Sequence, residues 1–130
     1  SLYTFITPQI TADVNFSFLG KTRFWNFLTR SYDPINAPKF KVNAKVAYNA
    51  DHGFHGNIGF RYIPEFDWSA GVHYGTIDEY LVIDSMVGYR FGKRYDLLLN
   101  INNLNGDVHR EIIGGPKLGR HITLKLNARF

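Results

Sequence analysis

Histidines give this chain its most ligand-like spacing. His52 and His55 stand three positions apart, which suits a metal site on a helix. They flank the start of an expected strand, where the same spacing gives poor geometry, and no third ligand lies nearby. His73 and His109 fall in two different long loops, where they could approach one another, although loop histidines are more often solvated. We therefore predict no metal and no cofactor, and we keep His73 and His109 as candidate ligand contacts.

The segment Gly114–His121 has two glycines separated by four residues, as in a phosphate-binding loop. Arg120 and His121 occupy the positions where that motif requires Lys and Ser or Thr. The segment also leads into an expected strand, so the helix N-terminus that would hold phosphate is missing. We reject a phosphate site here.

Two close carboxylate pairs lie in one loop, Asp78 with Glu79 and Glu65 with Asp67. Adjacent side chains on an extended chain diverge, whereas acid–base catalysis needs groups that converge on one substrate. No serine–histidine arrangement stands beside them. The sequence therefore predicts a protein that is not an enzyme.

The elements that would position these residues are strands. In the last ten residues, His121, Thr123, Lys125, Asn127 and Arg129 alternate with Ile122, Leu124, Leu126, Ala128 and Phe130. Successive side chains of a strand leave opposite faces of the sheet, so this strand has one polar and one apolar face. The same alternation predicts five earlier strands, at Ile10–Phe18, Lys39–Tyr48, Phe54–Tyr62, Tyr80–Phe91 and Tyr95–Leu104.

The connections between the expected strands alternate in length. Lys21–Pro38, residues 63–79 and Asn105–Gly119 are long, and the first of them allows a short helical turn at Phe24–Leu28. Asn49–Gly53 and Gly92–Arg94 have the composition of tight turns. All long loops therefore lie at one end of an antiparallel up-and-down sheet, as in outer-membrane barrels.

One face of the expected sheet carries both signs of charge. Its charged residues are Asp13, Lys39, Lys41, Lys45, Arg61, Asp84, Arg90, Asp96, Lys125 and Arg129. So many charges cannot be buried without partners, so this face is wet or is covered by another polar element. A plug inside a barrel is favoured over a pathway for an anionic substrate, because mixed charges suit a polar protein interface.

Composition agrees with a membrane sheet. The 130 residues include eleven Phe, eight Tyr and two Trp, and strands and membrane interfaces favour aromatic residues. No apolar run reaches the roughly 18 residues of a transmembrane helix, so residence in a membrane requires strands. The net charge of +4 forms no basic stripe, so nucleic-acid binding is not expected. The start at Ser1, without a charged leader, predicts a mature or truncated product.

About six strands do not close by themselves, since the smallest single-chain outer-membrane barrels use eight. In order and spacing, five segments resemble the C-terminal barrel portion of TonB-dependent outer-membrane receptors, in a Bacteroidota-like form. The similarity spans most of residues 36–130. The segments are Asn36–Asn43, Phe66–Gly71, Ile77–Asp84, Asn102–Asn105 with Val108–Arg110, and Gly114–Arg120 before a strand ending in Phe130.

The resemblance implies the last strands of a transmembrane 22-strand barrel in the bacterial outer membrane, with a plug domain and a TonB-coupling segment that this chain lacks. It implies energy-dependent uptake of a scarce ligand. Its partners would be the lipid bilayer, the rest of the barrel and its plug, the TonB complex and the outer-membrane assembly machinery, with a surface lipoprotein left open. Leu124, Leu126, Ala128 and Phe130 resemble the signal that this machinery recognises.

Ligand contacts are expected from aromatic, basic and histidine side chains of the long loops. The candidates are Trp25, Arg30, Tyr32, Trp68, His73, Tyr74, His109 and Arg110. Tyr80 is a further aromatic at a strand start. For Trp68 and Tyr80, an aromatic girdle at the membrane interface is an equally good interpretation.

Two alternatives stay open at this point. A soluble intracellular-type lipid-binding β-barrel has a similar length and the same alternation, with the apolar face inside. A complete small outer-membrane barrel would need two more strands, from Ser1–Pro8 and from the loop that holds Trp25.

Overall fold

The computed structural model describes residues 1–92 and 94–129, and this part of the chain folds as strands without a helix. The strands are β1 (Leu2–Phe5), β2 (Ile10–Phe18), β3 (Arg23–Asn26), β4 (Ser31–Pro34), β5 (Phe40–Tyr48), β6 (Gly53–Ile63), β7 (Phe66–Ala70), β8 (His73–Ile77), β9 (Tyr80–Phe91), β10 (Tyr95–Asn102) and β11 (His121–Ala128). The all-β antiparallel prediction is confirmed.

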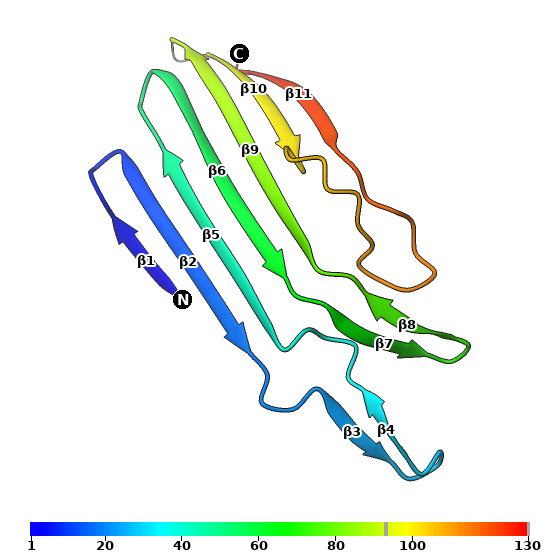
Figure 1. Cartoon of the computed structure of the whole chain (residues 1–130). Coiled ribbons are helices and arrows are strands. Elements are labelled where there is room, and N and C mark those ends of the chain that lie inside the picture. Colours follow the sequence, from blue (N-terminus) through cyan, green and yellow to red (C-terminus); the bar gives the residue numbers. More distant parts are fainter. Residues whose placement is uncertain (93, 130) are drawn as a thin grey trace.

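Seven strands form one open sheet in the order β1-β2-β5-β6-β9-β10-β11 (Figure 1). The prediction of about six strands was one short, because Leu2–Phe5 pairs with Thr11–Val14 of β2. Tight turns connect β1 to β2, β5 to β6 and β9 to β10, all at one end of the sheet (Figure 1). We call this the tight-turn end and the opposite one the long-loop end, and their predicted asymmetry is confirmed.

The strand register brings the polar sides of neighbouring strands onto one face of the sheet. Asp13 lies opposite Lys45, Gly59 opposite Asp84, and Arg90 opposite Asp96. Because a slip of one residue would turn every side chain of a strand to the other side, these pairs establish one continuous polar face. The apolar side chains share the opposite face, here called the apolar face.

Two aromatic belts border the apolar face. Near the long-loop end, Phe40 lies 6.1 Å from both Phe16 and Tyr62, measured between ring centroids. Near the tight-turn end, Tyr89 lies 4.8 Å from Phe54 and 4.7 Å from Phe91. Exposed aliphatic side chains fill the space between the belts: Val14, Val46, Ile58, Val87, Leu99 and Leu124. An apolar band between two aromatic girdles is the outer surface expected of a transmembrane β-barrel.

Two of the long loops contain further strands. The optional helical turn at Phe24–Leu28 was wrong, since β3 and β4 form a hairpin there that pairs Trp25 with Tyr32. The next loop contains the hairpin of β7 and β8. Strand propensity of aromatic residues explains both hairpins, whose short strands alternate too briefly to be read from the sequence. Both project beyond the main sheet at its long-loop end (Figure 1).

The best-buried apolar cluster lies on the polar face, at the long-loop end. It contains Ile63, Ile77, Tyr80 and Val82, with Phe66, Trp68 and Ile113 packed against it. The pairs Arg61 with Val82 and Ile63 with Tyr80 place these side chains on the side of Arg61. The girdle interpretation was therefore wrong for Tyr80, which is only 7% exposed.

The structure decides between the sequence alternatives. A soluble lipid-binding barrel needs a closed sheet with the apolar face inside, whereas the sheet of the described residues is open and its apolar face is exposed. The complete small barrel fails because β3 and β4 form a separate hairpin rather than an eighth wall strand. The described part of the chain offers no helix capable of spanning a membrane.

Candidate functional site

The polar face carries a histidine, a carboxylate and an arginine at each of its two ends. The tight-turn triad is His55, Asp96 and Arg90, and the loop triad is His109, Glu111 and Arg61. The first is built from strands alone. The second joins the sheet to the connection between β10 and β11, here called the β10–β11 loop.

The tight-turn triad contains one short contact, between its histidine and its carboxylate. The Nε2 atom of His55 lies 2.8 Å from Oδ1 of Asp96, and Arg90 Nε lies 3.9 Å from the other carboxylate oxygen. Arg90 also donates to the Asn49 side chain and to the Ala50 carbonyl. Three strands and one tight turn are thereby tied together.

A glycine makes room for the His55 ring. Gly88 lies opposite His55 in the pairing of β6 with β9. A Cβ atom at Gly88 would lie 2.6 Å from Nε2 of His55 and 3.0 Å from the Leu98 side chain. Since real Cβ atoms do not approach so closely, the buried imidazole requires glycine at this position.

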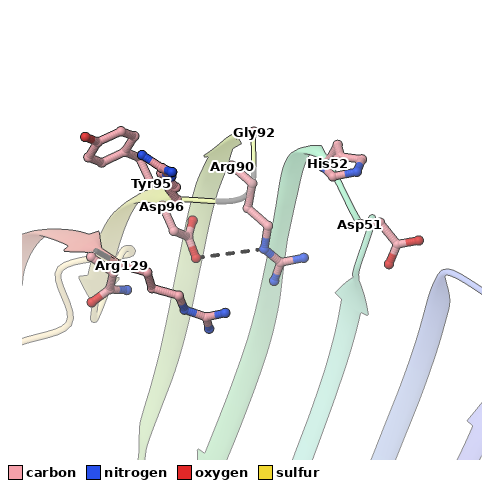
Figure 2. A pocket seen from close by; sticks show the side chains of 9 residues that line it. Asp51, His52, Arg90, Gly92, Tyr95, Asp96 and Arg129 are labelled. Carbon is pink, nitrogen blue, oxygen red and sulfur yellow. Dashed lines mark ion pairs between the residues drawn. The ribbon is translucent and has the colours of Figure 1, made fainter.

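A hollow of about 700 Å³ opens beside the tight-turn triad, lined by turn and strand-end residues. Figure 2 shows Arg90 and Asp96 pointing toward one another from neighbouring strands, with Arg129 beside them and His52 and Asp51 across the hollow. Of the two histidines with this spacing, His55 contacts Asp96 and His52 lines the hollow. Among the described residues, no group of three or more acidic, histidine or cysteine side chains could hold a metal.

The loop triad is looser. Glu111 Oε1 lies 3.7 Å from Nη2 of Arg61 and 3.8 Å from Nε2 of His109. The His109 ring stacks on Tyr80 with centroids 4.1 Å apart and planes at 15°. Its Nε2 atom and the Nε atom of Arg61 are buried without a hydrogen-bond partner. Two buried polar atoms are therefore left without a hydrogen bond where the loop meets the sheet.

At the start of the β10–β11 loop, side chains bond the part of β9 that β10 does not reach. β10 pairs with β9 no further than Ile101 opposite Ser85, which leaves the β9 edge from Leu81 to Asp84 without a β10 partner. Asn105 accepts from Ile83 N and donates to Leu81 O, and Asp107 accepts from Leu81 N. Asn103, which is 4% exposed, donates its backbone N–H to Asp84. These bonds hold the loop against β9 and place His109 over Tyr80.

The two hairpins are locked to each other. The Asn36 side chain, on a residue with φ of 58°, both donates to Ser69 O and accepts from Ser69 N at 2.8 Å. Arg23 pairs with Asp67. The β10–β11 loop joins this assembly because Ile113 packs on the same apolar cluster. The long loops therefore form one connected layer.

The predicted ligand contacts separate into three groups within this layer. Trp25 and Tyr32 stack edge to face on the first hairpin, with Arg30 in its turn. Trp68 packs on the apolar cluster, whereas Tyr74 is 79% exposed. His73 lies against Gly114, His109 lies on Tyr80, and Arg110 is exposed. The structure gives the two loop histidines separate contacts and shows none between them.

Most residues predicted for the charged face lie on the polar face as the alternation requires. Lys39 differs, because it precedes β5 and its ammonium group lies 5.9 Å from the ring centroid of Phe18. In the described part of the chain, Asp13, Lys41, Lys45, Lys125 and Arg129 form no ion pair. Of the predicted assembly signal, Leu124, Leu126 and Ala128 lie on the exposed edge strand β11, and Phe130 lies outside the described residues.

Sequence reasoning missed Glu111, Asn103 and Asn105. Glu111 contacts Arg61 of β6 and Asn105 bonds the backbone of β9, and no local spacing marks contacts of this kind. The Asn103 side chain bonds Asp107 within the same loop. The one available signal was the polar run from Asn102 to Asp107 directly after an expected strand, since Asn and Asp favour side-chain bonds to backbone over regular pairing.

No family model and no curated protein matches the chain. Solved structures do match. A chain of the FpvAI–pyocin S2 complex is 11% identical with a TM-score of 0.76, over 97% of this chain and 18% of that chain. The ferric-catecholate import receptor Fiu from E. coli K12, in its closed form, is 23% identical with a TM-score of 0.74, over 96% and 19%. The ferric enterobactin receptor PfeA from Pseudomonas aeruginosa, in complex with enterobactin, is 13% identical with a TM-score of 0.73, over 98% and 21%.

The matched structures are TonB-dependent siderophore receptors with β-barrels. The chain therefore has the fold of a segment of such a barrel, which confirms the resemblance at the level of fold. It spans about a fifth of the length of these receptors. They are transport receptors rather than enzymes, in agreement with the prediction for this chain. The Bacteroidota-like origin stays a prediction.

Proposed function

Because this chain has the fold of a TonB-dependent receptor barrel segment, we propose that it is the C-terminal wall segment of an outer-membrane transporter. The whole protein binds a scarce ligand at the long-loop end, outside the cell, and imports it with energy from TonB. The rest of a 22-strand barrel, the plug and the TonB-coupling segment belong to the part of the transporter outside this chain. The two edge strands, β1 and β11, would pair with the remaining wall.

The observation that carries this proposal is the construction of the apolar face. Its side chains are exposed, aliphatic in the middle and aromatic at both ends. β5, β6 and β9 contain 9, 11 and 12 residues, enough for a tilted strand to cross a bilayer. Exposed apolar patches of this extent on a soluble protein would be an aggregation hazard. Contact with lipid accommodates this apolar face without that hazard.

The polar face would then line the barrel interior. Four of its cations, Lys41, Lys45, Lys125 and Arg129, form no ion pair within the described residues, against one carboxylate of Asp13. This surplus of positive charge suits an interior partner with an acidic surface, which supports the assignment of this face to the plug.

Ligand contact is assigned to the connected loop layer at the long-loop end. Its candidates are those predicted from sequence, and among these candidates Trp25, Tyr32 and Tyr74 are the exposed aromatic side chains. PfeA is described in complex with enterobactin and Fiu as a ferric-catecholate import receptor. A surface lipoprotein is a further candidate partner of the same layer.

The two-faced wall can be tested because the chain contains no cysteine. In the transporter in its outer membrane, Leu124→Cys and Thr123→Cys would each receive a nitroxide spin label on neighbouring positions of β11. We expect oxygen, which partitions into lipid, to relax the Leu124→Cys label, and a water-soluble nickel chelate to relax the Thr123→Cys label. Preferential access of the chelate to both labels would overturn the proposal.

The assignment of this chain to a larger transporter has its own test. The intact mass of the polypeptide isolated from outer membranes under denaturing conditions should be about five times that of the 130 residues, since the chain spans about a fifth of the receptors it matches. A mass equal to that of this chain alone would refute the assignment.

A further inference from the structure

One asparagine of the β10–β11 loop takes the place of a peptide group beside β9. The side-chain amide of Asn105 accepts from Ile83 N at 3.0 Å and donates from Nδ2 to Leu81 O at 2.6 Å. A side-chain amide carries a donor and an acceptor, as a peptide group does, so it can satisfy both backbone groups. The attachment of the loop to β9 therefore depends on the nitrogen of this amide as well as on its oxygen.

The residue after this asparagine is a glycine for a structural reason. Gly106 has φ of 71°, in the left-handed region that other residues rarely adopt. Its N–H donates to the carbonyl oxygen of Asn103 at 3.0 Å, and a Cβ atom at this position would lie 3.0 Å from Nη2 of Arg120. The fold thus places asparagine and glycine side by side. Asn105 is the only asparagine of the sequence that a glycine follows.

We propose that Asn105–Gly106 is a site of spontaneous deamidation, which the bonds to β9 suppress and whose product releases the loop from β9. The backbone nitrogen of Gly106, after giving its proton to hydroxide, attacks Cγ of Asn105, and the side-chain nitrogen leaves as ammonia. Water then opens the cyclic imide at either carbonyl, which gives aspartate or isoaspartate at position 105. Water is the only reactant consumed. Glycine favours the attack because it has no side chain to obstruct the approach to Cγ.

In the folded chain both reacting groups are engaged elsewhere. The attacking nitrogen donates to Asn103 O, and the amide that it must reach is bonded through both its nitrogen and its oxygen to β9. Arg120 stabilises the same turn by donating to Leu104 O at 2.8 Å. Attack therefore requires the loop to leave β9. The rate of deamidation in the folded protein is reduced by the equilibrium constant of that local opening.

Deamidation removes the donor on which the attachment depends. The carboxylate of the aspartate product still accepts from Ile83 N, but it has no N–H to donate to Leu81 O. Two acceptors then face each other where a hydrogen bond stood. The new negative charge also lies two residues from Asp107, whose carboxylate already accepts from Leu81 N. Isoaspartate in addition inserts a methylene group into the main chain, so either product weakens the attachment of the loop to β9.

The consequence for ligand contact rests on the proposed function. His109 and Arg110, two of the candidate contacts, follow Asn105 in the same loop, and Ile113 packs this loop on the apolar cluster. Release from β9 would displace these side chains from the connected layer of long loops. An aged transporter would then bind its ligand less tightly than a newly made one.

The modification can be followed by mass spectrometry of the transporter, incubated in the same mildly alkaline buffer either folded in its outer membrane or unfolded in urea. Trypsin cleaves after Arg94 and Arg110, and fragment masses of the released peptide locate the change among its asparagines, Asn100, Asn102, Asn103 and Asn105. We expect Asn105 to convert fastest in urea and at least about tenfold more slowly in the folded transporter. Conversion in urea no faster than that of Asn102 or Asn103, or equally fast in both states, would overturn the proposal.

Two variants separate loop opening from intrinsic reactivity. Asp107→Ala removes the carboxylate that accepts from Leu81 N. The loop should then open more often, so Asn105 should convert faster in the folded transporter and at an unchanged rate in urea. Asp33→Ala is the matched control, because it removes a carboxylate bonded within the hairpin of β3 and β4 and should leave both rates unchanged. Equal folded rates in Asp107→Ala and the parent would refute protection by the bonds to β9.

Release of the loop can be followed with a nitroxide label at Lys117→Cys, an exposed loop position. Asn105→Asp reproduces the aspartate product and should make this label more mobile than in the parent. Asn127→Asp adds the same charge beside the hollow at the tight-turn end and should leave the label unchanged. A label that is as slow in Asn105→Asp as in the parent would refute the release.

The deamidation site and the transporter proposal fail in different measurements. Chelate access to both the Leu124→Cys and Thr123→Cys labels would refute the membrane wall without altering the conversion of Asn105. An Asn105 that converts in urea no faster than its neighbours, beside a lipid-exposed Leu124→Cys label, would refute the deamidation site alone.

Discussion

The two triads of the polar face contain the same three kinds of side chain and differ in closure. His55 contacts its carboxylate at 2.8 Å, whereas His109 lies 3.8 Å from its own. Both imidazoles are buried, with side chains 5% and 7% exposed. The carboxylates differ, since that of Asp96 is 25% exposed and that of Glu111 is 41% exposed. Chemistry alone does not explain why one triad is closed and the other open.

The difference follows from the backbone that carries each triad. His55, Asp96 and Arg90 sit on three neighbouring strands whose ladders fix their separation. Of the loop triad only Arg61 sits on a strand. The β10–β11 loop is held against β9 by side-chain hydrogen bonds and by one backbone bond, from Leu104 N to Ile83 O, rather than by a ladder. Strand register provides geometry that does not depend on the protonation of a side chain.

Removing the carboxylates should give the largest contrast between the triads. Asp96→Ala leaves the buried His55 without its acceptor and Arg90 without its carboxylate, and should cost about 2–3 kcal/mol of unfolding free energy. Glu111→Ala should cost less than about 1 kcal/mol, because Glu111 and Arg61 are partly exposed. Urea unfolding in lipid vesicles measures both. Equal losses of unfolding free energy in the two variants would show that the shorter histidine–carboxylate contact adds no stability.

A side chain at Gly88 would fill the space that the His55 ring occupies and so tests the tight-turn triad through its histidine. Gly88→Ala forces the imidazole off Asp96 and should cost about 1–3 kcal/mol by overpacking. Gly20→Ala is the matched control, since a Cβ atom there meets nothing within 4 Å, and it should stay within about 0.5 kcal/mol of the parent. The same unfolding measurement applies. If Gly88→Ala lost no more unfolding free energy than Gly20→Ala, glycine would not be needed to accommodate the His55 ring.

The ring beneath His109 should have a smaller effect. Tyr80→Leu keeps an apolar side chain in the cluster but removes the stacked pair, and should cost about 1 kcal/mol. It should also increase the mobility of a nitroxide label attached at Lys117→Cys, an exposed position of the β10–β11 loop. Tyr74→Leu, at an exposed tyrosine of the same layer, controls for general effects. An unchanged label in Tyr80→Leu would mean that the stack does not hold the loop.

Neutralising the Glu111 carboxylate while keeping its shape should have the smallest effect on global stability. Glu111→Gln should change unfolding free energy by less than about 1 kcal/mol, because the Glu111 and Arg61 side chains are partly exposed. Urea unfolding in lipid vesicles measures the change. A large loss of stability in Glu111→Gln would place the loop triad in the same class as the tight-turn triad.

The sequence predicted the main sheet because its evidence is local. Alternation of side chains specifies the two faces, so β2, β5, β6, β9, β10 and β11 were found with bounds that differ by at most two residues at either end. β1 was missed because four residues before a turn are too short for alternation to show. The hairpin of β3 and β4 was missed because two strands of four residues resemble a loop rich in aromatic residues.

The sequence by itself determined which side chains share a face and at which end the long loops lie, because both follow from the period of a strand and the lengths of its connections. Only the tertiary structure decided which charges meet. Asp96 reaches His55 through the register of three strands, and Glu111 reaches Arg61 because Asn103, Asn105 and Asp107 bend the loop along β9. Contacts across a sheet depend on pairing between segments far apart in the chain, and no local spacing encodes that pairing.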